Sequence, residues 1–265
     1  MGTLRENLKK LPRNLRAATF RVGVPETEKT RLKAVMSSLF LHIHSAKVHR
    51  HSLNWWYTLG LGLISFVLFV LLTISGIVLM LYYVPSVGEA YPRMQDLMES
   101  VSGGRILRNL HRWTAHGMVV AVFLHMARVF YTGSYRAPRE LNWLIGLALL
   151  VMTLALSFTG YLLPWDQLGY WAAVIGANIA GSPSEVTDAI GITPWFDVGG
   201  FQKKLLLGGR EIGGDALNRF YVLHCIVIPV LAAMGIALHF FRIRKDGGLS
   251  RPDPTSAPSQ DESDG

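Results

Sequence analysis

The sequence is poor in charged residues and has one cysteine. Only 17% of its 265 residues are Asp, Glu, Lys or Arg, and half are hydrophobic, whereas a soluble domain usually carries about 25% charged residues. With Cys225 alone, the chain cannot form an intrachain disulfide, a cysteine-ligated zinc or iron–sulfur cluster, or a C-x-x-C-H haem attachment. The shortage of cysteine excludes those sites, and the shortage of charge favours a membrane protein.

Four apolar stretches are long enough to cross a bilayer. They cover approximately residues 57–83, 113–131, 141–163 and 220–241, and about 20 apolar residues suffice for one crossing. The first stretch is too long and too far from the N-terminus to be a cleaved signal peptide. We therefore expect an all-α, multi-pass membrane protein built as a four-helix transmembrane bundle.

The segments around these stretches differ in composition. Residues 1–30 form a basic arm, residues 31–52 are expected to form an amphipathic interfacial helix, and the Pro-, Ser- and acid-rich tail at 246–265 is expected to be disordered. The transmembrane domain then covers residues 53–245. The amphipathic segment carries four histidines, for which a place among lipid headgroups is a simpler explanation than metal binding: His42, His44, His49 and His51.

Positive charge gathers on one side of the expected topology. Four spans place both termini and the connection at 133–140 on the same side, which carries 18 of the 26 lysines and arginines. By the positive-inside rule, both termini face the cytoplasm. This distribution favours contact with the lipid surface of the membrane and argues against nucleic acid as the partner.

Two pairs of histidines lie on the second and fourth stretches. His111 and His125 are 14 positions apart, and His224 and His239 are 15 apart. At about 100° per residue, each pair lies along one helix face with about 21–23 Å between its members. The topology puts His111 with His224 at the outer level and His125 with His239 at the inner level. An anchor or transporter that uses histidines for packing or proton relay is one explanation, but the matched spacing favours two metal centres clamped between imidazoles.

Glycines repeat the histidine interval. Gly62 and Gly76 in the first stretch, like Gly146 and Gly160 in the third, are 14 apart, which lets a flat macrocycle approach the backbone at both levels; small-residue helix packing is the alternative explanation. Haem iron with two axial imidazoles has no open coordination site, so such a haem transfers electrons and does not bind oxygen. Three arginines near the histidines are candidates to pair with haem propionates: Arg108, Arg112 and Arg128.

The chain resembles the cytochrome b family of the quinol-oxidising bc and b6f complexes over about residues 50–245. The matching runs are NLHRWTAHGMVVAVFLHMARVFYTGSYRAPRELNW, FTGYLLPWDQLGYWA and RFYVLHCIVIPV. The PWDQ-x-x-YW run and the 15-residue interval are similar to those of the shorter b6 type. The resemblance implies two non-covalent b haems, one on His111 and His224 and one on His125 and His239, that carry electrons across the membrane between two quinone sites.

The resemblance also implies partners, an activity and a location. The chain would be one subunit, incomplete by itself, of a translocase-class quinol oxidoreductase with a Rieske iron–sulfur protein, a cytochrome c-type or other acceptor, and quinone or quinol as substrate. The complex would be a homodimer in an energy-transducing membrane, such as a bacterial inner membrane. An outer quinone pocket would include Asp166, Tyr170 and Trp171. The alternative is a di-haem b subunit that anchors another quinone-linked dehydrogenase.

Three features depart from the patterns of the family. Gly60 stands about where the b6 type has the cysteine that attaches an additional haem, which argues against a third, covalent haem by that route. No PEWY-type motif occurs, so we expect a separate subunit to carry the later cytochrome b spans. The connection at 164–219 is longer than in the b6 type, and its run GGREIGG (Gly208–Gly214) is unmatched.

Overall fold

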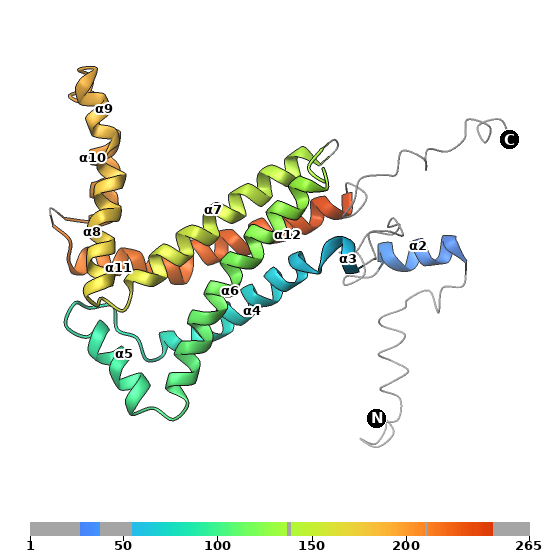
Figure 1. Cartoon of the computed structure of the whole chain (residues 1–265), viewed down its shortest axis with the longest axis horizontal. Coiled ribbons are helices and arrows are strands. Elements are labelled where there is room, and N and C mark those ends of the chain that lie inside the picture. The colour runs from blue at the N-terminus through green and yellow to red at the C-terminus, as the bar shows by residue number, and fades with distance from the viewer. Residues whose placement is uncertain (1–26, 38–54, 137–138, 210, 246–265) are drawn as a thin grey trace, which may run out of the picture. The chain divides into compact units, whose positions relative to one another are not determined.

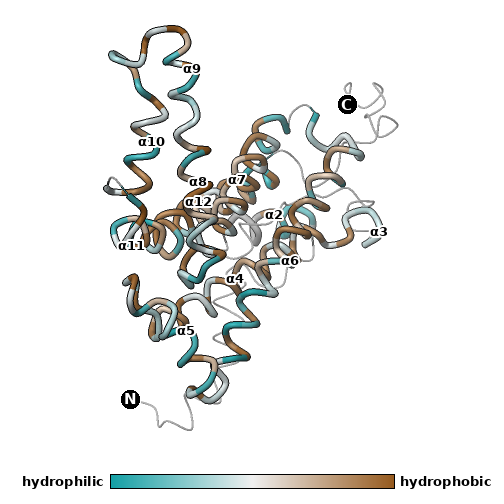
Figure 2. The backbone as a smooth tube through the Cα atoms, turned by 60° about the vertical axis from the view of Figure 1, so that its left-hand side comes forward, coloured by the Kyte–Doolittle hydropathy of each residue, from teal (hydrophilic) through white to brown (hydrophobic). Residues whose placement is uncertain are grey.

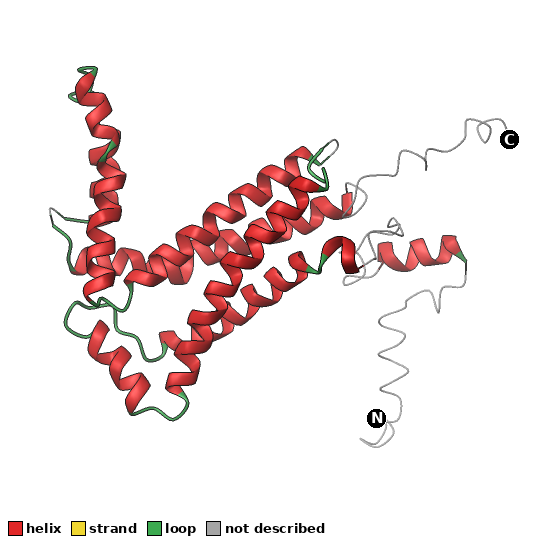
Figure 3. Ribbon diagram, viewed as in Figure 1, coloured by secondary structure: helices red, strands yellow, loops and turns green. Residues whose placement is uncertain are grey.

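All regular secondary structure in the part of the chain that the structure describes is helical. A computed structural model covers residues 27–37, 55–136, 139–209 and 211–245 in describable detail (Figures 1 and 3). In chain order the helices are α2 (Glu28–Ser37), α3 (Trp55–Thr58), α4 (Leu61–Met80), α5 (Ala90–Glu99), α6 (Gly104–Tyr131), α7 (Glu140–Leu162), α8 (Gln167–Gly181), α9 (Pro183–Ala189), α10 (Val198–Leu207), α11 (Gly214–Val222), the π-helical turn η3 (Leu223–Val227) and α12 (Ile228–Lys245).

Four helices of the described chain are long and apolar enough to cross a membrane, as expected from the sequence. They are α4, α6, α7 and the continuous helix Gly214–Lys245, which runs through α11, η3 and α12. Long hydrophobic stretches follow these helices (Figure 2), and side chains such as Leu63 and Val151 are about 60% exposed or more on the isolated chain. Such surfaces suit contact with lipid, where backbone groups must be satisfied within the helix itself.

The second and fourth spans begin earlier than the hydropathy pattern predicts. α6 starts at Gly104, whereas the apolar stretch starts at Trp113, because the first turns of the helix carry Arg105, Arg108 and Arg112. The fourth helix starts at Gly214, well before the stretch expected from Phe220. Charged residues mark where a helix leaves the hydrocarbon core and do not mark where the helix ends.

The chain packs as two units. Of the described residues, one unit takes those within 60–127 and 146–236, and the other takes those within 1–59, 128–145 and 237–265. In the latter, Arg128 lies over the ring of Tyr57, 6.0 Å from its centroid. The Tyr57 hydroxyl lies 3.3 Å from the hydroxyl of buried Ser134, which lies 2.8 Å from that of Thr132. These contacts tie the end of α6 to the segment that precedes α4.

The first span is interrupted at its start. Leu59 and Gly60 both have left-handed backbones, with φ of 50° and 59°, and α4 begins at the next residue. A left-handed conformation costs a residue with a side chain about 1–2 kcal/mol. A cysteine at position 60 would therefore be strained in this backbone, in line with the sequence argument against a third haem there.

The fourth span contains one wide turn. In η3 the backbone N–H of Ile228 donates to the carbonyl of Leu223, five residues back, instead of four as in an α-helix. The next residue, Pro229, has no N–H, and its ring would meet the carbonyl of Cys225 in a regular helix. The sequence predicts a bend at Pro229; the structure places a π-turn directly before it.

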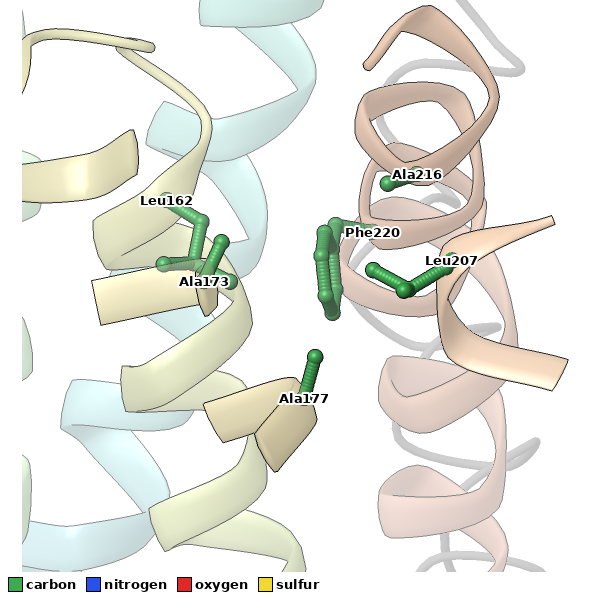
Figure 4. Close-up of a cluster of buried hydrophobic side chains, with 6 residues drawn as sticks. All are labelled: Leu162, Ala173, Ala177, Leu207, Ala216 and Phe220. Atoms are coloured by element: carbon green, nitrogen blue, oxygen red, sulfur yellow. The ribbon is translucent and has the colours of Figure 1, made fainter. Parts of the chain in front are cut away.

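A helical hairpin of α8 and α10 packs against the ends of α7 and α11. The hydrophobic cluster at this contact is centred on Phe220 of α11, which is 1% exposed. It also contains Ala173 and Ala177 of α8 and Leu207 of α10 (Figure 4). Burying a phenylalanine contributes about 1.5–3 kcal/mol. The guanidinium of Arg219 donates to the carbonyls of Lys204 and Leu205 at the end of α10.

The junction of α9 and α10 is held by one carboxylate. Asp197 accepts hydrogen bonds from the hydroxyl of Ser184, at 2.5 Å, and from the backbone N–H of Gly200, at 2.8 Å, and these lower the pKa of Asp197. Because the folded pKa lies below the unfolded one, the carboxylate stabilises the junction above the unfolded pKa. That contribution is lost as the pH falls through the folded pKa.

We expect the Gly200 amide to lose protection in acid. Hydrogen exchange of this amide, compared at each pH with the Asp197→Asn variant, should show an additional acceleration in the native chain below the lowered pKa. The asparagine oxygen still accepts a hydrogen bond but does not titrate in this range. Identical pH dependence in the two proteins would contradict the role given to Asp197.

Several sequence expectations fall outside the described residues. The basic arm and the tail lie outside them almost entirely, as do His42, His44, His49 and His51 of the expected interfacial helix. Of that segment the structure describes only the end of α2 (Glu28–Ser37), with no side chains beyond Leu32. The domain boundaries drawn from composition stay predictions.

Candidate metal centre

His111 of α6 and His224 of η3 face each other across the bundle. Their ring centroids lie 6.3 Å apart, and the rings are inclined at 74°. A metal–nitrogen bond of about 2 Å and about 1 Å from nitrogen to ring centre, on both sides, require about 6 Å. The two imidazoles are thus spaced to hold one metal ion between them.

The Nδ1 atom of His111 is engaged by the first span. It lies 2.8 Å from the hydroxyl oxygen of Ser75, whose side chain is 3% exposed. The single hydroxyl proton of Ser75 is donated to the carbonyl of Leu71, at 2.7 Å, so the hydroxyl accepts from His111 Nδ1–H. This assignment leaves Nε2 of His111 unprotonated, as a metal ligand must be.

The Nδ1 atom of His224 is engaged in the same way by the third span. It lies 3.1 Å from the carbonyl oxygen of Leu156 and 3.2 Å from the hydroxyl of Thr159. A carbonyl can only accept, so Nδ1 of His224 carries the proton and Nε2 is free to ligate. Hydrogen bonds of this kind fix both the tautomer and the orientation of ligating histidines.

Glycines make room for the imidazole edges. A Cβ built on Gly160 would lie 2.5 Å from Cε1 of His224, and one on Gly76 would lie 3.2 Å from Cε1 of His111. At the other level, a Cβ on Gly62 would lie 3.4 Å from Cε1 of His125. The sequence reasoning assigned this space to a macrocycle; the structure shows that histidine rings lie against these three glycines. Gly146 lies in α7, and its role stays a prediction.

The inner pair is defined less completely. His125 lies in α6 beside Gly62, and His239 lies in α12; both are half-buried. The pairing of these two histidines rests on the helix register and stays a prediction.

Two histidines alone do not complete a metal site. Among the residues that the structure describes, no group of three or more His, Cys, Asp or Glu side chains could hold a metal ion. Iron in a porphyrin needs only two axial ligands from protein, because the macrocycle supplies the others. The pair His111 and His224 therefore fits a haem better than a bare ion.

The three arginines differ in what they contact. The Nε atom of Arg128 is buried and has no hydrogen-bond partner within the described chain, so it suits an anionic group such as a haem propionate. Nη1 of Arg108 contacts the sulfur of Met98 at 2.6 Å, and Arg112 is exposed. Arg128 thus has the strongest structural support of the three, and pairing of all three with propionates stays a prediction.

The residues expected at an outer quinone pocket lie at the start of α8. Oδ1 of Asp166 accepts from the backbone N–H of Gly169 at 2.8 Å and caps the helix. The Tyr170 ring packs edge-to-face on Trp165 and Trp171. Asp166 therefore has a structural role as a helix cap, and quinone contact by Asp166, Tyr170 and Trp171 stays a prediction.

The structure adds Ser75 and Thr159, which the sequence reasoning missed. Each hydroxyl residue directly precedes one of the glycines that repeat the histidine interval (the interval glycines Gly62, Gly76, Gly146 and Gly160), in the dipeptides Ser75-Gly76 and Thr159-Gly160. A hydroxyl residue next to the glycine at the outer level of both spans was the signal that could have found them.

Known proteins are similar to this chain in sequence. The model of the family described as Cytochrome b/b6/petB matches residues 44–247. Cytochrome b6 of Heliobacterium mobile is 44% identical over 200 residues, covering 76% of this chain and 87% of that protein. Cytochrome b6 of Synechococcus sp. (strain WH7803) is 43% identical over 203 residues, covering 77% and 87%.

A solved structure shares the arrangement of helices. A chain of a "Hyperthermophilic respiratory Complex III" superposes with a TM-score of 0.68 and 27% sequence identity. The similarity covers 81% of this chain and 53% of that one. The chain therefore spans about half the length of that structural relative.

Proposed function

Because the chain belongs to the cytochrome b/b6 family, we propose that it is the di-haem subunit of a quinol:cytochrome c, or similar, oxidoreductase. It is an integral membrane protein and a cytochrome b6-type subunit of a quinol-oxidising complex. The observation that carries the haem assignment is the pair His111 and His224, with ring centroids 6.3 Å apart and both Nε2 atoms left free to ligate; the second haem rests on the helix register of His125 and His239.

The chain's own residues would hold the haems as follows. His111 and His224 would hold one haem at the outer level, and His125 and His239 would hold the other at the inner level. When bound, two such haems supply one-electron carriers at two depths of the membrane, between two quinone sites. Ser75, Thr159 and the carbonyl of Leu156 fix the tautomers of the outer ligands.

Arg128 and the other basic side chains would compensate the haem carboxylates. Arg128, whose Nε atom is buried and which lies beside Tyr57, would donate to a propionate at the inner level, where an unpaired charge would otherwise be costly. Arg108 and Arg112 would serve the outer level. No covalent attachment is expected, since Gly60 replaces the b6-type cysteine in a left-handed backbone.

Removing the hydroxyl of Ser75 should loosen the outer haem. Ser75→Ala leaves His111 without the acceptor at 2.8 Å, and loss of such a support typically costs about 10–100-fold in metal affinity. The control is Thr73→Val on the same helix, whose hydroxyl donates only to the Phe69 carbonyl. Haem retained through detergent washing is the measurement; equal retention by both variants would contradict the role of Ser75.

The function is tested by the partners of the native complex. We expect a Rieske iron–sulfur protein and a subunit with the later cytochrome b spans to co-purify with this chain from an energy-transducing membrane, and quinol to reduce the b haems. A homodimeric complex is expected. Co-purification of a dehydrogenase in place of the Rieske protein would support the alternative, a di-haem anchor of another quinone-linked enzyme.

A further inference from the structure

The π-turn η3 contains His224 and precedes His239 in the fourth span, and both histidines are proposed to ligate haem. The N–H of Leu223 still makes the α-helical bond to the carbonyl of Arg219. The N–H of Ile228 then bonds to Leu223, five residues back. Such a turn takes one more residue than the α-helical turn it replaces. After it, residues Ile228–Lys245 form a regular α-helix.

The two histidine helices have unequal intervals. In α6, which is α-helical throughout, 14 steps bring His125 to about 40° short of the direction of His111. In a regular helix, the 15 steps from His224 would bring His239 to about 60° past it. The directions of the second histidine relative to the first therefore differ by about 100° between the two helices. That is enough to turn an inward side chain towards a neighbouring face.

The π-turn reduces this difference. The wide turn runs from Leu223 to Ile228, and all but its first residue step follows His224, so the 15-residue interval approaches the helical phase of 14 steps found in α6. His224 is itself held by its hydrogen bond to Leu156, so the correction falls on the residues that follow it. We infer that η3 is a register device that brings His239 to the face of His224, and that the extra residue and the π-turn belong together.

Pro229 explains why the wide turn lies here. In a regular α-helix its ring would collide with the carbonyl of Cys225 and leave that carbonyl without a donor. A π-turn that ends just before the proline opens the helix at that point. The position of Pro229 therefore favours taking up the extra residue directly after His224, and not further along α12.

Two deletions separate this inference from its alternatives; it rests on the proposed haem ligation. Deleting Ile226, 51% exposed within η3, and deleting Met234, 65% exposed in α12, both shorten the interval to 14. Deletion of Ile226 should remove the wide turn, leave the helix kinked at Pro229, and keep two haems per chain. Deletion of Met234 leaves η3 in place, turns His239 away by about 100°, and should keep only the outer haem.

The readouts are haem per chain and the redox titration of the b-haem spectrum. Two components are expected after deletion of Ile226, and one after deletion of Met234. Equal haem content in both variants, or the reverse order, would overturn the inference, whereas a native chain with no haem would overturn the proposed function. If neither deletion folds, a structure of the native complex decides: an Ile228 N–H bonded to Leu223 supports the device, and one bonded to His224 contradicts it.

Discussion

Replacing His224 with alanine is expected to remove one of two haems and abolish electron transfer across the membrane. In the proposed outer site His224 is one of two ligating histidines, and its ring centroid lies 6.3 Å from that of His111. A haem with one remaining axial ligand would lose its six-coordinate, low-spin state. The haem-to-chain ratio should fall from two to one, and quinol-dependent turnover of the complex should fall below detection.

His116 provides a matched control on α6. It is exposed, packs edge-to-face on Trp113 with ring centroids 5.5 Å apart, and lies about 140° around the helix from His111. His116→Ala should keep two haems per chain and the native spectrum. Full haem content in His224→Ala, or equal loss in the two variants, would show that the ligands have been assigned wrongly.

Adding a methyl group at Gly160 is expected to be nearly as damaging. Its Cβ would lie 2.5 Å from Cε1 of His224, closer than carbon atoms approach in proteins. The ring cannot shift easily, because its Nδ1 is bonded to Leu156. Overpacking of this kind costs about 1–3 kcal/mol, and here it would act directly on a ligand. Gly160→Ala should lose most of the outer haem.

The interval glycines should form a graded series. A Cβ on Gly76 would lie 3.2 Å from Cε1 of His111, so Gly76→Ala should lose part of the outer haem. A Cβ on Gly62 would lie 3.4 Å from Cε1 of His125, an ordinary contact, so Gly62→Ala should keep nearly all of its haem. Gly117→Ala in α6, with only Leu68 at 3.8 Å, is the control and should be harmless or stabilising. Equal loss at Gly62 and Gly160 would mean that the macrocycle, and not the imidazole edge, needs the space.

The architecture could be predicted because it depends on local properties of the sequence. The length of an apolar stretch decides whether it crosses a membrane, and the spacing of His111 and His125 decides which helix face they share. The order of the spans then pairs His111 with His224. These inferences need no knowledge of how side chains meet.

The supports of the outer site could not be predicted with the same ease. Whether the Ser75 hydroxyl, which donates to its own helix, also meets His111 depends on the rotation of α4 against α6, which hydropathy does not determine. The same holds for Thr159 and the Leu156 carbonyl. The 14-residue spacing of the glycines is visible in the sequence, but it was interpreted as space for a macrocycle. Spacing alone does not give the positions of the histidine rings that lie against these glycines.

The wide turn of the fourth span shows most clearly what sequence reasoning could not predict. The 15-residue interval and Pro229 were both visible in the sequence, and both indicated an irregular helix. A bend and a π-turn are alternative responses of a helix to proline. Only the bond from Ile228 to Leu223 distinguishes them.

The most direct measurement is a pyridine haemochrome spectrum with haem-to-chain stoichiometry on the native complex, followed by acid–acetone extraction. Two b haems per chain, both extractable, are predicted from the two histidine pairs and from Gly60 at the b6-type attachment position. A haem that remains covalently bound to this chain would contradict the interpretation of Gly60. A folded chain without haem would contradict the central claim that these histidines ligate iron.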